Sequence, residues 1–263
     1  EIPKRDWSSD VCSSDLEQSA ASASFDAWIK QYRPDENSVN SVMSYYTKGS
    51  ILGLLFDLEI RTRTNGAKSL DDVMRGLLDK YGLPKPGFTD AQLKAEFEAA
   101  AGTDLTDFWS KYVTGTADVD FDAALAKAGL TLTRGYEKST PYADSKTDKP
   151  GALGIRTRNE GDRVVVSSVL TGLPAYDGGV NVNDELVAID GRKVNASNSA
   201  KMIADFKAGQ KTTLTVFRRD KLMTIDLTAA VRPFDNYTIT ENEKATDAQK
   251  KLRMAWIGED PKK

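Results

Sequence analysis

The fold of the C-terminal half is decided by residues 179–191, which read Gly-Val-Asn-Val-Asn-Asp-Glu-Leu-Val-Ala-Ile-Asp-Gly. The apolar run at 186–189 has the length and composition that are typical of a short buried strand. Glycine turns lie on both sides of this run, at Gly179 and at Gly191. A strand held between two such turns predicts a small β-rich domain around this stretch.

The sequence on either side of this stretch sets the limits of the domain. One helix is predicted at 197–206, and short strands are predicted at 164–166, 186–189, 214–217 and 223–227. Residues 139–150 consist mainly of Ser, Thr, Asp, Lys and Pro, which is typical of a linker. We therefore expect a β-rich domain at 151–233, a linker before it at 139–150 and a charged tail after it at 234–263.

Three motifs in this region, taken in order, resemble a PDZ domain. Gly151-Ala152-Leu153-Gly154-Ile155 is similar to the carboxylate-binding loop of that family, and Leu173-Pro174-Ala175 to the turn and short helix that follow it. The 179–191 stretch is similar to the strand and glycine turns of the family, with Asn183 where the family usually has Gly. Asn tolerates the left-handed backbone better than most residues, so we expect this turn to be kept.

The resemblance to PDZ domains implies a way of binding a ligand. Leu153, Gly154 and Ile155 would present backbone amides to the C-terminal carboxylate of a peptide or protein partner. The peptide would add as a strand beside residues 155–157 and against the helix at 197–206. Gly154 would allow a close approach because it has no Cβ. The alternative is intramolecular docking, in which the domain binds its own protein and no free peptide.

Helical signals dominate the region before the predicted linker. A short helix or turn is expected at 24–30. Longer helices, marked by capping residues or closing glycines, are expected at 39–63, 70–81, 90–101, 105–113 and 121–128. Trp28, Phe108 and Trp109 are expected to be core residues of this region. The chain is thus expected to be an α+β multidomain protein, with an all-α subdomain at 22–138 followed by the β-rich domain.

Several short motifs within the helical region carry a second resemblance. They are Ser24-Phe25-Asp26-Ala27-Trp28-Ile29, Tyr32-Arg33-Pro34-Asp35-Glu36-Asn37, Ser44-Tyr45-Tyr46-Thr47-Lys48-Gly49, Leu58-Glu59-Ile60-Arg61 and Ser69-Leu70-Asp71-Asp72-Val73-Met74-Arg75. They resemble the segment between the zinc site and the PDZ domain in the glycyl aminopeptidase family of zinc metallopeptidases. The resemblance implies that the helical subdomain is the C-terminal part of a thermolysin-like catalytic domain.

The zinc chemistry of that family requires ligands that this sequence lacks. A His-Glu-x-x-His helix and a further Glu would hold the metal, and a metal-bound water would be the nucleophile. The sequence has no His and a single Cys, which excludes this motif, Ser-His-Asp catalysis and any His-ligated zinc site within the chain. We therefore expect no cofactor in this chain and zinc in a full-length parent, with the ligands upstream of Ser24.

The motif Tyr46-Thr47-Lys48-Gly49 resembles the Tyr-x-Lys-Gly element of related gluzincin aminopeptidases. The resemblance implies that the Tyr46 hydroxyl stabilises the oxyanion of the tetrahedral intermediate, a contact worth about 3 kcal/mol in similar sites. The alternative is a core residue, because Tyr46 falls on the apolar stripe of the expected helix at 39–63. Lys48 is interpreted as a solvated helix charge, and Gly49 as a residue that allows close packing against the zinc-bearing element.

Residues 6–16 differ from the rest of the chain. They read Asp-Trp-Ser-Ser-Asp-Val-Cys-Ser-Ser-Asp-Leu, without a helical or strand period, and resemble the translation of a sequencing adapter. The alternative is an ordinary disordered N-terminus rich in Ser and Asp. We interpret residues 1–21 as artefactual or disordered. Cys12 then says nothing about the redox compartment, and the compartment stays open between cytoplasm and periplasm, with a slight preference for the periplasm.

Charge and hydropathy narrow the choice of partners. The 263-residue chain has a net charge of −3 and no apolar run of membrane-spanning length, so neither nucleic acid nor a membrane is expected as a partner. We expect a truncated PDZ-containing zinc metallopeptidase that is inactive alone, from a parent that removes N-terminal residues such as Gly or Ala from peptides. The alternative is a non-enzymatic PDZ adaptor that binds peptide C-termini.

Overall fold

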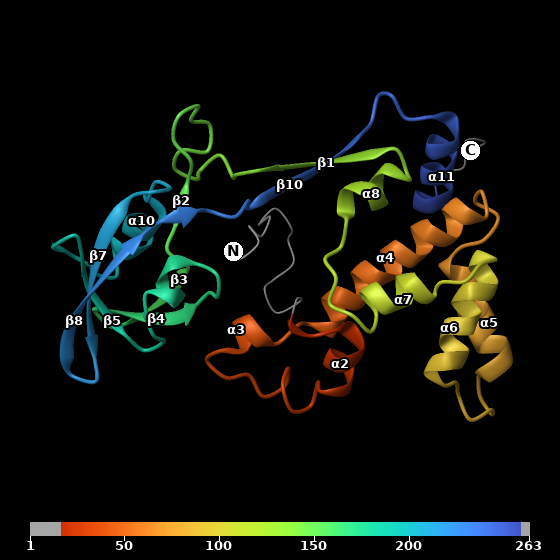
Figure 1. The fold of residues 1–263 in the computed structure, drawn as a ribbon, viewed down its shortest axis with the longest axis horizontal. Coiled ribbons are helices and arrows are strands. Elements are labelled where there is room, and N and C mark those ends of the chain that lie inside the picture. The colour runs from red at the N-terminus through yellow and green to blue at the C-terminus, as the bar shows by residue number, and fades with distance from the viewer. Residues whose placement is uncertain (1–16, 259–263) are drawn as a thin grey trace. The chain divides into compact units, whose positions relative to one another are not determined.

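The computed structural model describes residues 17–258 and shows helices ahead of a β-rich region, as the sequence predicts (Figure 1). The described residues fall into two compact units. The β-rich unit comprises Ile29–Val42 and Arg134–Tyr237, and the helical unit comprises 17–28, Met43–Thr133 and 238–258. The segment that resembles an adapter, with Cys12, lies outside the described residues. Within 17–258, no helix has the length and apolar character needed to span a bilayer.

The helical unit is organised around α4 (Tyr45–Arg63), which buries Leu52, Leu55 and Leu58. Five helices pack against α4, and they are α2 (Ala20–Phe25), α5 (Leu70–Tyr81), α6 (Asp90–Ala101), α8 (Phe121–Ala126) and α11 (Asp247–Ile257). Phe108 and Trp109 of α7 (Thr106–Tyr112) stack on Phe56 of α4, with ring centroids 4.8 and 5.7 Å away. These two aromatic residues therefore belong to the core, as predicted.

Two of these helices begin where the sequence predicts, because their first turns are satisfied by side chains. Ser69 and Asp72 form a reciprocal capping box at the start of α5, and Thr89 and Gln92 form another at the start of α6. Each box satisfies N–H groups that have no partner within the helix. Gly102 ends α6 in the left-handed conformation, with φ of 68°.

The single helix predicted at 39–63 is wrong, because the structure divides it into two. α3 (Ser38–Ser41) ends at Val42, which is extended with φ −113° and ψ 115°, and α4 begins only at Tyr45. Ser44 accounts for the restart, because its Oγ accepts a hydrogen bond from the Thr47 N–H at 3.4 Å. Polar side chains that bond to nearby backbone compete with helix continuation.

The prediction that Trp28 is a core residue is also wrong, since Trp28 is 78% exposed in the structure. The short helix or turn expected at 24–30 is mostly turn, because α2 ends at Phe25. Ser19 sets the start of α2, because its side chain accepts a hydrogen bond from the Ser22 N–H at 3.2 Å. After Phe25 the chain runs through turns, and Trp28 lies in that segment.

The β-rich unit contains an antiparallel sheet with the strand order β3-β4-β5-β7-β8, and β6 pairs with β5. The strands are β3 (Ile155–Glu160), β4 (Arg163–Val169), β5 (Glu185–Ile189), β6 (Arg192–Lys193), β7 (Lys211–Arg218) and β8 (Lys221–Thr228). Two short pairs are formed by β1 (Leu130–Gly135) with β10 (Asn236–Glu241) and by β2 (Gly151–Ala152) with β9 (Ala230–Val231). Besides α3, the unit contains the helices α9 (Pro174–Asp177) and α10 (Ser199–Ala204). The predicted strands and the predicted helix at 197–206 are thus confirmed.

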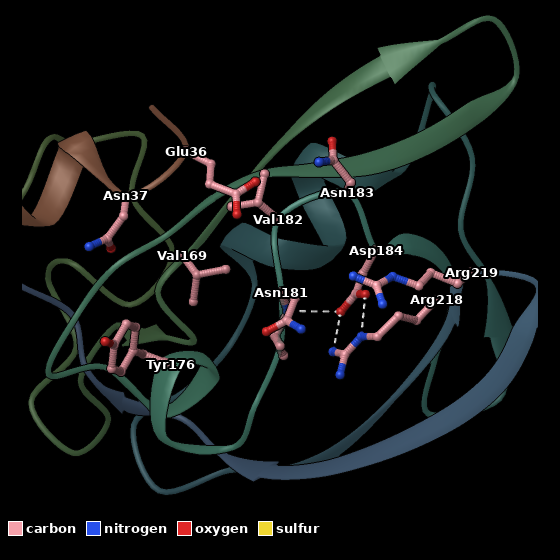
Figure 2. A pocket seen from close by; sticks show the side chains of 11 residues that line it. Glu36, Asn37, Val169, Tyr176, Asn181, Val182, Asn183, Asp184, Arg218 and Arg219 are labelled. Atoms are coloured by element: carbon pink, nitrogen blue, oxygen red, sulfur yellow. Dashed lines mark hydrogen bonds and ion pairs between the residues drawn. The ribbon is translucent and has the colours of Figure 1, made fainter. Parts of the chain in front are cut away.

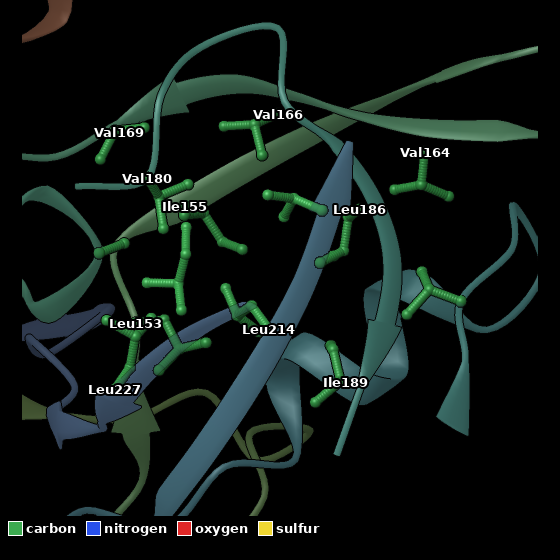
Figure 3. Packing of buried hydrophobic residues seen from close by; sticks show 14 of the residues in the cluster. Leu153, Ile155, Val164, Val166, Val169, Val180, Leu186, Ile189, Leu214 and Leu227 are labelled. Atoms are coloured by element: carbon green, nitrogen blue, oxygen red, sulfur yellow. The ribbon is translucent and has the colours of Figure 1, made fainter. Parts of the chain in front are cut away.

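Apolar residues from the strands of the sheet form the core of the β-rich unit (Figure 3). In β7, buried Leu214 and Val216 alternate with less buried residues, so one face of the strand packs inward. Asn183 adopts φ of 71°, which confirms that this turn keeps a left-handed residue without glycine.

Residues 139–150, predicted to be a linker, form turns that are bonded to the β-rich unit. The Thr140 hydroxyl donates to the Asp235 carboxylate at 3.1 Å. Lys207 pairs with Asp148 at 3.0 Å and lies over the ring of Tyr142. The hydrogen bond with Asp148 raises the pKa of Lys207. The residues of this segment thus have defined partners within their own unit.

Candidate peptide-binding site

The predicted peptide-binding residues Leu153, Gly154 and Ile155 form the connection between β2 and β3. Leu153 and Ile155 are 1% and 8% exposed, and both side chains lie among the core residues of the β-rich unit (Figure 3). Because these side chains point inward, the groups that this loop can offer to a ligand are those of its backbone.

Gly154 is required at its position for two independent reasons. Its φ of +85° is a conformation that residues with a Cβ rarely adopt. A Cβ built on Gly154 would also lie 2.3 Å from the Cβ of Leu173, far inside van der Waals contact. The backbone of the loop therefore packs directly on the residue that precedes α9.

Two hydrogen bonds fix the direction of the loop amides. The Leu153 carbonyl accepts from the Ala175 N–H, and the Gly154 carbonyl accepts from the Leu170 N–H, both at 2.8 Å. In a planar trans peptide the N–H points opposite to the C=O of the same plane. The N–H groups of Gly154 and Ile155 therefore point away from Leu170 and Ala175. Successive backbone N–H groups at a glycine turn are the kind of donor set that can bind an anion.

The same bonding pattern continues into β3, which is the edge strand of its sheet. Ile155 lies opposite Val169, and the bond from the Leu170 N–H to Gly154 makes this a non-hydrogen-bonded pair. Both backbone groups of Ile155 therefore face the outer edge of the sheet.

Thr157 repeats this orientation two residues further along β3. It lies opposite Val166, whose N–H donates to the Asp184 carbonyl at 2.8 Å and whose carbonyl accepts from the Asn183 N–H at 2.9 Å. Val166 thus uses its backbone groups on the side away from β3, and those of Thr157 face outward. Alternate outward residues on an edge strand are what an added peptide strand needs for pairing.

The N-terminal side of the loop is held by the segment that follows α10. The Gly151 N–H donates to the Phe206 carbonyl at 2.7 Å, and the Arg232 N–H donates to the Pro150 carbonyl at 2.8 Å. Phe206 is 2% exposed, so this attachment is anchored in the core. The helix that the sequence analysis expected to flank a bound peptide therefore contacts the strand that leads into the loop.

A second polar feature of this unit is a cavity of about 590 Å³, which the loop residues do not line (Figure 2). Arg218 donates to both carboxylate oxygens of Asp184 at 2.7 Å, and Asp184 also accepts from the Asn181 N–H. The hydrogen bond to Asp184 raises the pKa of Arg218. Since Asp184 is only 1% exposed, this ion pair holds the turn before β5 in place.

Tyr46, the predicted catalytic residue, lies in the first turn of α4 in the helical unit. It is 62% exposed and its ring contacts that of Tyr45, with centroids 4.2 Å apart. Tyr46 is therefore not a core residue among the residues that the structure describes. Its role in catalysis stays a prediction.

Lys48, two residues after Tyr46 in this motif, is buried where a solvent-exposed charge was expected. Lys48 is 2% exposed, so the interpretation as a solvated charge is wrong. It is an inward-facing position of α4, between the exposed Thr47 and Gly49 positions. A Cβ on Gly49 would meet nothing within 4 Å in this structure, and the expected packing of Gly49 against the zinc-bearing element stays a prediction.

The described residues do not fit a zinc ion. They contain no group of three or more His, Cys, Asp or Glu side chains that could hold a metal, and the full sequence has no His.

Asn40, which the sequence analysis did not single out, joins the turn after β4 through its side chain and is 6% exposed. No local pattern marks it, because it lies in a polar stretch of Ser and Asn residues far from that turn in sequence. Only the structure brings the two segments together.

Comparisons with known proteins agree with both resemblances. The model of the PDZ domain matches residues 151–229, and the model of the M61 glycyl aminopeptidase matches residues 9–52. No curated protein matches the chain in sequence.

Several solved structures are similar to this chain in fold. An aminopeptidase N family protein from Idiomarina loihiensis shares the fold, with a TM-score of 0.76, 24% identity and coverage of 94% of this chain. The chain spans 42% of the length of that protein. The HtrA-type protease AlgW also matches, with a decapeptide (TM-score 0.30, 23% identity, 32% of this chain and 30% of that chain) and with a tripeptide (0.29, 24%, 32% and 32%). The chain thus carries a PDZ domain, preceded by a segment that matches the M61 glycyl aminopeptidase family.

Proposed function

We propose that the PDZ domain binds the free C-terminus of a peptide or protein, as an accessory domain of a peptidase. The orientation of the Gly154 and Ile155 amides supports this proposal most directly. Both N–H groups point away from the sheet contacts of the loop, and the edge strand that leads from them offers Ile155 and Thr157 for pairing. A carboxylate at the loop and a strand along β3 would use these groups together.

The match to the glycyl aminopeptidase family supports the peptidase part of the proposal. The chain would be a portion of a zinc aminopeptidase that removes residues such as Gly or Ala from peptide N-termini. The zinc ligands would come from the part of the parent protein outside this chain, and Tyr46 would contribute its hydroxyl to the oxyanion site.

The binding proposal can be tested with a panel of fluorescent decapeptides that differ only in the C-terminal residue. Each peptide is prepared with a free carboxylate and as its C-terminal amide, and anisotropy is measured with the full 263-residue chain. We expect at least one apolar C-terminus to bind, and its amide to bind at least tenfold more weakly, because the amide places no full charge on the loop N–H groups. Equal binding of the two forms would contradict a carboxylate site.

The rival adaptor function makes a different prediction for the parent gene. Recovery of the sequence upstream of residue 17 would reveal a His-Glu-x-x-His motif if the chain belongs to a peptidase. An upstream sequence without zinc ligands, together with confirmed peptide binding, would instead support the adaptor.

A further inference from the structure

Asn40 is a buried polar residue of the segment Ile29–Val42. This segment precedes the PDZ domain in sequence but belongs to the β-rich unit. Asn40 lies in α3 and is 6% exposed. Its side chain reaches Val169, which is 129 residues away in the sequence. A buried amide requires hydrogen-bond partners, so its contacts show what it holds.

The Asn40 side chain bonds to both sides of one short turn. Its Nδ2 donates to the Val169 carbonyl at 2.8 Å, and its Oδ1 accepts from the Thr171 N–H at 2.9 Å and from the Thr171 hydroxyl at 3.0 Å. The backbone partners determine the orientation of the amide, because a carbonyl needs a donor and an N–H needs an acceptor. A flipped amide would lose these contacts.

The residue between these two contacts is Leu170, which holds the carboxylate-binding loop. Its N–H donates to the Gly154 carbonyl at 2.8 Å, and the same peptide plane carries the Ile155 N–H. A shift of Leu170 would therefore rotate the Gly154–Ile155 plane and redirect one of the two amides of the site.

We propose that Asn40 is a positioning residue for the carboxylate-binding loop, acting through the turn at Val169–Leu170–Thr171. This inference rests on the peptide-binding function proposed above. Asn40 lies within the range that matches the glycyl aminopeptidase model, so the peptidase segment would tune the ligand affinity of the PDZ domain. Hydrogen bonds to two backbone groups of one turn restrict its motion more than burial of an apolar side chain would.

The first test compares Asn40→Ala with Ser41→Ala in the full chain. Ser41 is an exposed neighbour in α3 whose hydroxyl bonds only locally, to the Asn37 carbonyl at 3.2 Å. With the tightest free-carboxylate decapeptide of the panel and its amidated twin, we expect Asn40→Ala to weaken the free form at least fivefold and the amide much less. Ser41→Ala should leave both unchanged. Equal weakening of the two peptides would indicate a structural role alone and overturn the proposal.

A second test needs no peptide and separates this proposal from the proposed function. The amide ¹H–¹⁵N shifts of Gly154 and Ile155 are recorded for the unbound full chain. We expect Asn40→Ala to move both resonances, and Ser41→Ala to leave them in place. Thr171→Val removes the 3.0 Å hydroxyl contact with Asn40 and keeps the shape of the residue, so it should fold if Asn40→Ala does not. We expect a smaller shift of the same two amides in Thr171→Val. Unmoved Gly154 and Ile155 resonances in the folded variants would overturn the role of Asn40, whether or not any peptide binds.

Discussion

The candidate site of the helical unit is a side chain, whereas the candidate site of the β-rich unit is made of backbone groups. In the helical unit the candidate is the side chain of Tyr46, exposed at the start of α4, and its proposed partners lie outside the chain. In the β-rich unit the candidate is a stretch of backbone, and every contact that orients it comes from the same unit. A site made of backbone is thus complete within its own fold, whereas a site made of one side chain depends on what is assembled around it.

The largest effect that would sharpen this comparison concerns Tyr46 in the full-length parent. We expect Tyr46→Phe to lower kcat about 100-fold with little change in KM, because a hydroxyl that contacts only the transition state contributes about 3 kcal/mol. Tyr45→Phe is the matched control, since its ring lies against that of Tyr46. Steady-state kinetics on a small peptide substrate would measure both. A normal kcat for Tyr46→Phe would remove the helical unit from the catalytic proposal.

The second prediction concerns a substitution at Gly154, which should destabilise the β-rich unit. Gly154→Ala places a Cβ against Leu173 at a positive φ, and we expect it to lower the free energy of unfolding by about 3 kcal/mol and to abolish peptide binding. Gly161→Ala is the control, because φ is +64° there and a Cβ would meet nothing within 4 Å. It should cost only about 1 kcal/mol and leave binding intact.

Denaturant unfolding and anisotropy would measure the two glycine variants. If Gly161→Ala were as damaging as Gly154→Ala, the backbone angle alone would account for the effect. The close packing of the loop on Leu173 would then contribute nothing to stability or to peptide binding.

The third and smallest effect is a difference between the two units in how their stability depends on pH. Burial raises the pKa of Glu59, but its hydrogen bonds with Lys127 and Arg63 outweigh burial and hold the pKa below its ordinary value. A carboxyl with a lowered pKa stabilises the folded state above its unfolded pKa, and this contribution is lost as pH falls through the folded pKa. The helical unit should therefore lose stability below about pH 4.5.

Glu59→Gln should lower the free energy of unfolding by about 1 kcal/mol at neutral pH and flatten its acid dependence. Glu160→Gln is the control in the β-rich unit, where Glu160 pairs with Arg158 and Arg163 at the surface. An exposed pair contributes little, so this variant should change neither quantity measurably. Urea unfolding between pH 3 and 7, conditions chosen to span the carboxyl range, would test both. An unchanged acid slope in Glu59→Gln would contradict the assignment.

The parts of the fold that local sequence determines were predictable. α5 and α6 begin and end at their predicted residues because capping side chains and a closing glycine lie within one turn of each end. The left-handed turn at Asn183 could also be predicted, since the conformation is a property of that residue type. The loop at Leu153–Ile155 was predicted from its resemblance to the carboxylate-binding loop of PDZ domains, and its role as a binding site stays a prediction.

The parts that depend on distant contacts were not predictable. Lys48 reads as a surface charge and is buried, and Trp28 reads as a core residue and is exposed, because burial depends on what packs against each residue. The break between α3 and α4 leaves Asn40 on a short helix that reaches the turn after β4. A period-based prediction over 39–63 extends the helix through this break and hides the contact.

The grouping of Ile29–Val42 with the β-rich unit has a consequence for how such domains are exchanged between proteins. Recombination at the segment 139–150 would transfer the PDZ sequence as a single block and leave Asn40 behind. The recipient would then carry a turn whose Val169 carbonyl and Thr171 N–H need new partners. If Asn40 positions the carboxylate-binding loop as proposed, a graft of this domain that keeps its ligand affinity should carry both pieces of sequence.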